Sequence, residues 1–175
     1  MEYKLLRKLF WQMTAELVKM YVADPNKFIR LEYPTEGQPD WKIEDTIVFL
    51  NLVERDDSYG QQFESQDITE TNTVIRHRYR TRVWDVVFTA YGPNAYELVN
   101  TLKDGVFTES SRTLLSKNNV FLVPDLPVCR QSPELFAGKW WNRWNIILCF
   151  NELYEAQPED VGHIDTVQIH GNANR

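Results

Sequence analysis

The sequence predicts an α+β domain in which a mainly antiparallel sheet carries a long projecting β-hairpin and helices pack on one face of the sheet. The order of the hydrophobic periodicities along the chain is helix, strand, long strand, helix and then further strands. The length of 175 residues suits one self-sufficient core, because a chain of this size buries roughly 70% of its unfolded surface. We therefore expect a single domain over residues 1–155, followed by an acidic C-terminal tail or arm over 156–175.

Residues 2–23 are predicted to form a long first helix. Apolar side chains recur there at steps of three and four, and charged side chains occupy the other side. The helix is expected to end before Pro25, because the proline ring disfavours helical geometry at Asp24. Residues 33–40 consist of turn-forming residues and are predicted to form a loop.

The longest predicted strand covers Thr71 to Thr89, which is 19 residues without Gly or Pro and with β-formers on alternating positions. At about 3.3 Å per residue it would reach roughly 60 Å, two or three times the usual strand length. We therefore expect part of it to project beyond the core as a hairpin arm, paired with a strand over Thr46 to Val53. The acidic stretch from Glu54 to Glu70 is predicted to be a solvated loop between the two strands.

The second half of the chain is predicted to contain one further long helix and several short elements. Gly92 and Pro93 end the long strand and begin a helix that extends to Phe107, because proline is tolerated in a first helical turn. The remaining predicted elements are a helical turn over 110–117 and strands over 120–123, 128–131 and 140–154.

Composition excludes several classes of protein. The chain carries 25 acidic and 19 basic side chains, a net charge of −6, which disfavours general binding to duplex DNA. The longest apolar stretches, such as Ile146 to Phe150, are far shorter than the roughly 20 residues that cross a bilayer, so we expect no membrane association. Cys129 and Cys149 are expected to be buried free thiols, with a disulfide between them as the less favoured alternative.

No catalytic motif is present, and we expect no catalytic, cofactor-binding or metal-binding residues. Of the three histidines, two lie in the tail, and His77 stands between two arginines on an expected exposed strand. Glu54, Asp56 and Asp57 could hold a divalent cation in a metal-dependent hydrolase, but such an acidic run is more typical of a solvated turn.

The most informative feature is a row of four arginines on every second position, which places them on one face of the long strand. The row consists of Arg76, Arg78, Arg80 and Arg82. Like charges about 7 Å apart repel one another, and three explanations for the row remain open. It either keeps an exposed edge strand from aggregating, or it meets an acidic surface of a neighbouring copy, supplied by the Glu54 to Glu70 loop or by the tail. A position facing DNA in a channel is a weaker third explanation.

These considerations define candidate residues for a subunit or tube interface. Trp141 is included because both faces of the 140–154 strand carry tryptophan, so Trp141 is covered either by the Pro-rich loops or by an interface. The candidates are Arg76, Arg78, Arg80, Arg82, Asp56, Asp57, Glu64, Asp67 and Trp141. The alternative function of a different class is a nucleic-acid-binding module that combines the arginine row with Tyr79 and Trp84.

Three segments carry a resemblance to a known family. They read WDVVFTAYG from Trp84, PNAYELVNTLKDGVF from Pro93, and LPVCRQSPELFAGKWWNRWNIILCFNEL from Leu126. Together they resemble the tail-terminator or neck-terminator family of tailed bacteriophages: a strand that ends in an aromatic residue, Gly and Pro, then a helix, and later a long final strand. The resemblance covers residues 1–155 and does not include the acidic tail.

The resemblance implies a structural subunit of the virion. Members of this family form a hexameric ring that caps the tail tube, ends its polymerisation and joins the tail to the head connector. They catalyse no reaction and bind no cofactor. The implied partners are further copies of the chain, the tail tube protein and a head–tail connector or neck protein, and the sheath protein is a further candidate. DNA would only pass through the lumen, no membrane is involved, and the protein would reside at the tail–neck junction after assembly in the host cytoplasm.

Overall fold

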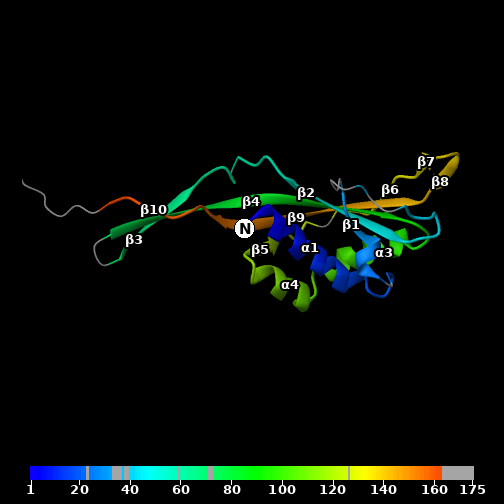
Figure 1. Ribbon diagram of the computed structural model, residues 1–175, viewed down its shortest axis with the longest axis horizontal. Coiled ribbons are helices and arrows are strands. Elements are labelled where there is room, and N and C mark those ends of the chain that lie inside the picture. Colours follow the sequence, from blue (N-terminus) through cyan, green and yellow to red (C-terminus); the bar gives the residue numbers. More distant parts are fainter. Residues whose placement is uncertain are drawn as a thin grey trace, which may run out of the picture.

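A computed structural model describes residues 1–22, 24–32, 37, 40–58, 60–70, 73–125 and 127–162. Most of the predicted loop over 33–40, and the tail beyond residue 162, lie outside these residues. The described chain consists of a mostly antiparallel sheet and helices that pack on it, so the predicted α+β class is confirmed (Figure 1).

The main sheet has its longest strands at the centre. The long strand β4 pairs antiparallel with β2 on one side and with β9 on the other, while β1 pairs parallel with β2 at the edge. In spatial order the strands are β1 (Ile29–Leu31), β2 (Ile47–Glu54), β4 (Thr73–Tyr91), β9 (Arg143–Glu155) and β5 (Val120–Leu122). The short strand β6 (Arg130–Gln131) also pairs with β9.

The helices all lie on one side of the sheet (Figure 1). They are α1 (Tyr3–Val18), α2 (Pro25–Phe28), α3 (Ala95–Gly105) and α4 (Glu109–Ser116). The helix α1 ends at Val18, earlier than predicted, and Pro25 begins α2. Proline suits the first turn of a helix, and the Asp24 side chain caps this turn by accepting a hydrogen bond from the backbone N–H of Asn26 at 3.0 Å.

The hydrophobic core lies between these helices and one face of the sheet. Along β4 the buried side chains on that face alternate with others that point to the opposite face, as the period of a strand requires. On the helix side they are Trp84, Val86, Phe88 and Ala90. The helix α1 contributes Phe10, whose ring meets that of Phe150 on β9 edge to face at 4.8 Å. The opposite face of the sheet carries no helix in the described chain (Figure 1).

The long strand changes partners along its length. The strand β2 pairs with Trp84 to Tyr91 in the core, whereas the outer Thr73 to Tyr79 pair with β3 (Glu64–Glu70), so the prediction that Thr46 to Val53 is the partner of the arm is wrong. The prediction of a solvated loop for the whole Glu54 to Glu70 stretch is therefore wrong, since its second half forms a strand. A short strand β10 (Glu159–Asp160) pairs with β4 on the other side, opposite Arg76 and Ile75. We call β3, β10 and the Thr73 to Tyr79 part of β4 the distal ribbon; it lies beyond the helices (Figure 1).

The predicted strand over 140–154 is interrupted at Asn142. Trp140 and Trp141 belong to a separate strand, β8 (Lys139–Trp141), which forms a hairpin with β7 (Glu134–Phe136). The turn of this hairpin consists of Ala137 and Gly138, with φ of 49° and 74°. Two consecutive residues with positive φ are typical of the tight turns that join two strands. The Asn142 side chain donates a hydrogen bond to the carbonyl oxygen of Gly92 at 3.2 Å, which ties this break to the end of β4.

Candidate functional site

The four arginines of the predicted row do lie on one face of β4, but each has a carboxylate partner within the same chain. The N···O distances are 2.8 Å for Arg76–Asp67, 3.3 Å for Arg78–Glu159, 3.8 Å for Arg80–Glu54 and 2.9 Å for Arg82–Glu152. The acidic surface that one explanation assigned to a neighbouring copy is therefore supplied, in this structure, by the same chain. Two segments expected to be loop and tail form strands β3 and β10 along β4, and they bring Asp67 and Glu159 beside it.

The inner end of the row is part of the core. Glu152 on β9 is fully buried, and its carboxylate accepts two hydrogen bonds from Arg82 at 3.1 and 2.9 Å. The indole of Trp84 and the amino group of Met1 each donate to the same carboxylate at 2.7 Å. Burial alone would raise the pKa of Glu152, but the donors from Arg82, Met1 and Trp84 outweigh it, so the pKa is lowered. We call these four residues the Glu152 cluster.

The guanidinium of Arg82 also lies 4.1 Å from the centre of the Tyr154 ring, and it donates a hydrogen bond to the carbonyl oxygen of Met1 at 2.7 Å. Arg82 is thus held on several sides by its own chain. Its role in this structure is to fix the start of α1 to the centre of the sheet.

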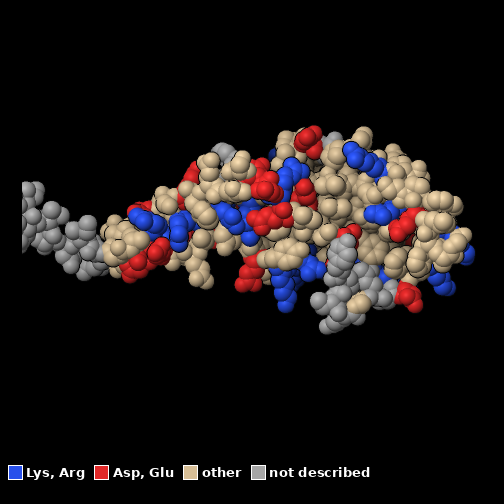
Figure 2. Space-filling view, turned by 90° about the horizontal axis from the view of Figure 1, so that it is seen from above, with Lys and Arg blue, Asp and Glu red and all other residues tan. Residues whose placement is uncertain are grey.

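The outer end of the row is exposed. Arg76 on β4 binds Asp67 on β3 with two parallel hydrogen bonds of 2.8 and 2.9 Å, and this contact lowers the pKa of the Asp67 carboxyl. Arg78 pairs with Glu159 on β10 from the other side. Figure 2 shows basic and acidic side chains lying next to each other along the distal ribbon. Its surface is therefore one of mutually neutralised charges.

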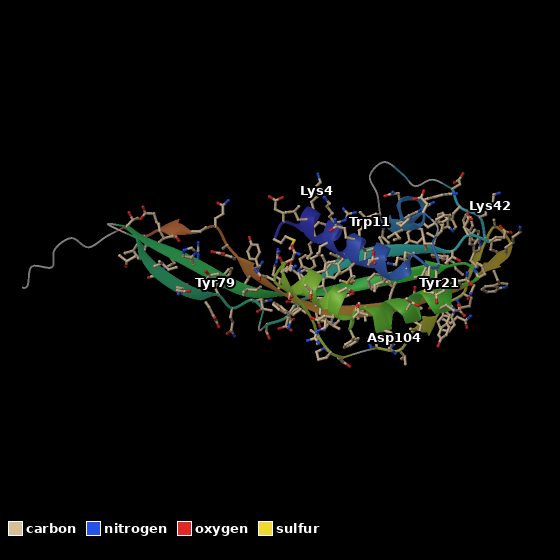
Figure 3. All side chains as sticks on the ribbon, turned by 90° about the horizontal axis from the view of Figure 1, so that it is seen from below. Lys4, Trp11, Tyr21, Lys42, Tyr79 and Asp104 are labelled. Carbon is tan, nitrogen blue, oxygen red and sulfur yellow. The ribbon has the colours of Figure 1, made fainter. Side chains whose placement is uncertain are left out.

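The alternative nucleic-acid surface is not assembled. Trp84 is only 3% exposed and donates its N–H to Glu152, so its ring cannot stack on a base. Tyr79 is on the distal ribbon, away from α1, where Lys4 and Trp11 lie (Figure 3). Its odd position on β4 places it on the face opposite the arginines, where its ring stacks with that of His77 at 6.3 Å. The two aromatic residues and the arginine row thus share no surface.

The acidic residues at the end of β2 belong to a turn. Asp56 accepts a hydrogen bond from the side chain of Gln61 at 2.7 Å, and Asp57 accepts one from the backbone N–H of Gly60 at 3.3 Å. Glu64 stands at the start of β3, exposed and opposite Tyr79. Across the part of the chain that the structure describes, no group of three or more His, Cys, Asp or Glu side chains is placed to hold a metal ion.

Trp141 lies in an aromatic cluster on the helix-free side of the sheet. Its ring is 6.0 Å from that of Trp41, which in turn packs on Phe49 at 5.3 Å and on Tyr91 at 6.2 Å. Trp41 directly follows the predicted Pro-containing loop. Half-buried Trp141 is thus partly covered by its own chain. The hydroxyl of Tyr91 donates to Glu134 at 2.8 Å, and burial together with this carboxylate raises the pKa of Tyr91 to about 12.

The structure also settles the state of the two cysteines. Cys129 and Cys149 are free and half-buried, which confirms the prediction of free thiols and corrects that of full burial. Burial raises the pKa of both thiols.

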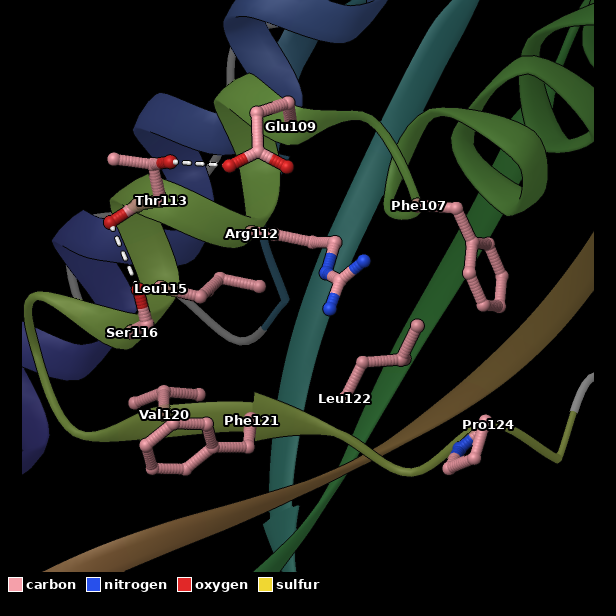
Figure 4. Close-up of a pocket in the computed structure, with 10 residues that line it drawn as sticks. All are labelled: Phe107, Glu109, Arg112, Thr113, Leu115, Ser116, Val120, Phe121, Leu122 and Pro124. Carbon is pink, nitrogen blue, oxygen red and sulfur yellow. Dashed lines mark hydrogen bonds between the residues drawn. The ribbon is translucent and has the colours of Figure 1, made fainter.

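Two exposed apolar features were not predicted. One is the β7–β8 hairpin, where Leu135 and Trp140 are 58% and 65% exposed. The other is a groove of about 500 Å³ between α4 and β5 (Figure 4). The sequence does hold a signal for the hairpin, since Ala137-Gly138 stands between two aromatic stretches as a turn would. The groove joins segments that are separate in the sequence and leaves no local pattern.

The comparisons with known proteins support a structural role in a phage. A family model described as phage neck terminator protein matches residues 4–174. A comparison with curated proteins gives no match. Within the described residues, no helix has the length and apolar character to span a membrane. The match includes the segment after residue 155, which corrects the expectation that the tail lies outside the family pattern. Because the match covers nearly the whole chain, the protein belongs to the phage neck terminator family of structural virion proteins.

Proposed function

We propose that this chain assembles into a hexameric ring that caps the phage tail tube, ends tube polymerisation and joins the tail to the head connector. The observation that carries the proposal is the match of residues 4–174 to the neck terminator family. In this proposal the chain catalyses no reaction and binds no cofactor. Its partners are other copies of itself, the tail tube protein, a connector or neck protein and, as a further candidate, the sheath protein.

The helix-free face of the sheet supports an assembled state. Val53 on β2 and Ile147 and Leu153 on β9 are exposed on that face. Exposed apolar side chains that gather on one face are typical of surfaces that meet another protein. A single copy leaves this face open, and a neighbour in a ring, or the tube below it, would cover it.

The structure changes which residues we assign to the contact. The exposed Arg76, Arg78, Glu64 and Asp67 on the distal ribbon remain in the proposal as contacts to a neighbouring subunit or to the tube. Arg80 and Arg82 are given a structural role, because their own side chains are only 28% and 11% exposed. Asp56, Asp57 and Trp141 are engaged in a turn and in the aromatic cluster, and we assign no contact to them.

The test is a tube polymerisation assay. Purified tail tube protein is polymerised with increasing amounts of the chain, and tube lengths and end structures are measured by negative-stain electron microscopy. We expect shorter tubes, each with a ring at one end. Tube lengths that do not change at saturating chain, together with the absence of rings, would overturn the proposal.

Two charge-reversal variants test the assignment of the distal ribbon. The double variant Arg76→Glu/Arg78→Glu should cap tubes poorly, because it places four acidic groups where two ion pairs stand. The double variant Lys4→Glu/Lys8→Glu on the exposed side of α1 changes the net charge by the same amount and serves as control. If both variants cap tubes equally well, the distal ribbon is not part of the interface, and the proposal of a capping ring still stands.

A further inference from the structure

The β7–β8 hairpin and the groove between α4 and β5 complement each other in their chemistry. We propose that the β7–β8 hairpin of one copy docks into the α4–β5 groove of the next copy and so forms the contact between neighbours in the ring. This inference rests on the proposed function, because it assumes that copies of the chain assemble with one another.

The hairpin has the character of an interface anchor. Leu135 and Trp140 pair directly across its two strands, so their side chains lie on the same face. On its other face, Trp141 packs against Phe136 at 6.3 Å and against Trp41 on the body of the domain at 6.0 Å. One face thus fixes the hairpin while the other holds two large apolar side chains in solvent. Tryptophan in such a position is enriched among residues that dominate binding energy.

The groove has matching chemistry. Its floor is formed by buried Leu115 on α4 and Val120 on β5, and its rim includes half-buried Leu122 on β5 and Phe107, which is 41% exposed. A volume of about 500 Å³ lies within the range of pockets that enclose bulky apolar groups. The groove therefore offers an apolar floor of suitable size for a Leu and a Trp side chain, with polar groups of Glu109, Thr113 and Ser116 along its α4 side.

A charged group in the groove favours an aromatic occupant. Figure 4 shows Arg112 reaching from α4 into the space between Phe107 and Leu122. Among the described residues, Arg112 has neither an ion-pair partner nor an aromatic ring stacked on its guanidinium. A guanidinium attracts the face of an indole ring, most strongly when water is excluded. Trp140 of another copy would supply that ring.

The positions of the two surfaces make the contact one between copies. In Figure 1 the β7–β8 hairpin lies at the end of the molecule opposite the distal ribbon, whereas α4 and β5 lie on the helix side nearer the middle. The hairpin therefore cannot fill the groove of its own chain. A contact between two different surfaces repeats from copy to copy, and it closes into a ring when the rotation between neighbours allows.

The experiment uses one variant for each surface and a matched control. Trp140→Glu disables the hairpin, Phe107→Glu disables the groove, and Met20→Glu changes an apolar side chain that is 77% exposed beyond the end of α1. Self-association is measured by analytical ultracentrifugation, alone and with tube protein, after circular dichroism has shown that each variant is folded. We expect both interface variants to associate at least about 30-fold more weakly than wild type and the control to be unchanged.

Mixing gives the sharper result. Each interface variant keeps one intact surface, so an equimolar mixture of Trp140→Glu and Phe107→Glu should form one-to-one dimers and nothing larger. Variants that assemble like wild type, or a mixture that forms no dimer, would overturn this contact while wild-type rings still supported the proposed function. Loss of tube binding by Trp140→Glu with unchanged self-association would make the tube protein the occupant and would equally overturn it. A wild-type chain that stays monomeric alone and with tube protein would overturn both proposals.

Discussion

The Glu152 cluster gives the strongest prediction about stability, through the substitution Glu152→Gln. The change removes the charge that balances Arg82, which is itself almost completely buried. Removing one member of a buried ion pair costs about 3 to 5 kcal/mol, because the other charge stays buried without compensation. The glutamine oxygen can still accept a hydrogen bond, so we expect the lower end, about 3 kcal/mol.

That loss is large for a domain of this size. With about 2 to 4 °C of midpoint change per kcal/mol for chains of 150 to 250 residues, the thermal midpoint should fall by about 6 to 12 °C. The assay is urea unfolding followed by tryptophan fluorescence, together with a thermal scan by circular dichroism. The matched control is Glu155→Gln, three residues away on the same strand but exposed and paired with His77, where the change should stay below about 1 kcal/mol.

The same cluster predicts a pH dependence. The pKa of Glu152 is lower in the folded chain than in the unfolded chain, so its contribution is complete above the ordinary glutamate pKa of about 4.3. The contribution is lost as the pH falls from there through the folded pKa, because the unfolded state binds the proton first. Wild type should therefore lose stability more steeply than Glu152→Gln over this acidic range. Equal slopes, together with equal midpoints for Glu152→Gln and Glu155→Gln, would refute the reasoning.

Three further predictions concern other parts of the fold. Gly92→Ala should cost about 3 kcal/mol in urea unfolding, because φ there is +102° and a Cβ would lie 2.3 Å from the Asp45 carbonyl oxygen. Gly138→Ala, at φ +74° with open space around it, should cost only about 1 kcal/mol. In a tyrosine absorbance titration, the signal that is present in wild type and absent in Tyr91→Phe should report ionisation of the Tyr91 hydroxyl near pH 12. The free energy that this protonated hydroxyl contributes to folding should be lost as the pH rises from about 10 towards 12. Ionisation of Tyr91 near pH 10 would contradict the burial of its hydroxyl. Arg76→Gln should leave the thermal midpoint unchanged, whereas Arg82→Gln should lower it, and equal effects would contradict the distinction between the two ends of the row.

The elements that sequence predicts well are those with a clear period and a core to face. The helix α1 and the strand β4 carry apolar side chains at the period of their geometry, β2 is a short run rich in β-branched and aromatic residues, and the structure has each within a few residues of the predicted bounds. The strand β3 could not be recognised in this way. Its residues are almost all polar, and it is a strand because β4 offers it a backbone edge and a row of opposite charges.

The candidate site shows the same limit. The period correctly placed the four arginines on one face, but periodicity within one strand does not reveal what lies on the neighbouring strands. Asp67 and Glu159 are 9 and 83 positions from Arg76 in the sequence, and the fold brings both to its side. The Glu152 cluster likewise unites residues that are 70 and 151 positions apart in the sequence, a kind of contact that only the tertiary structure can show.

The uninterrupted course of β4 has a mechanical consequence. A single uninterrupted strand runs from the distal ribbon to the centre of the core. A pull along it loads the hydrogen bonds to β2, β3 and β9 together in shear, so that they resist as a set and do not open one by one. A chain built in this way can carry tension between the two ends of β4 without strand-by-strand separation, a property that would suit the proposed position between the tail and the head connector.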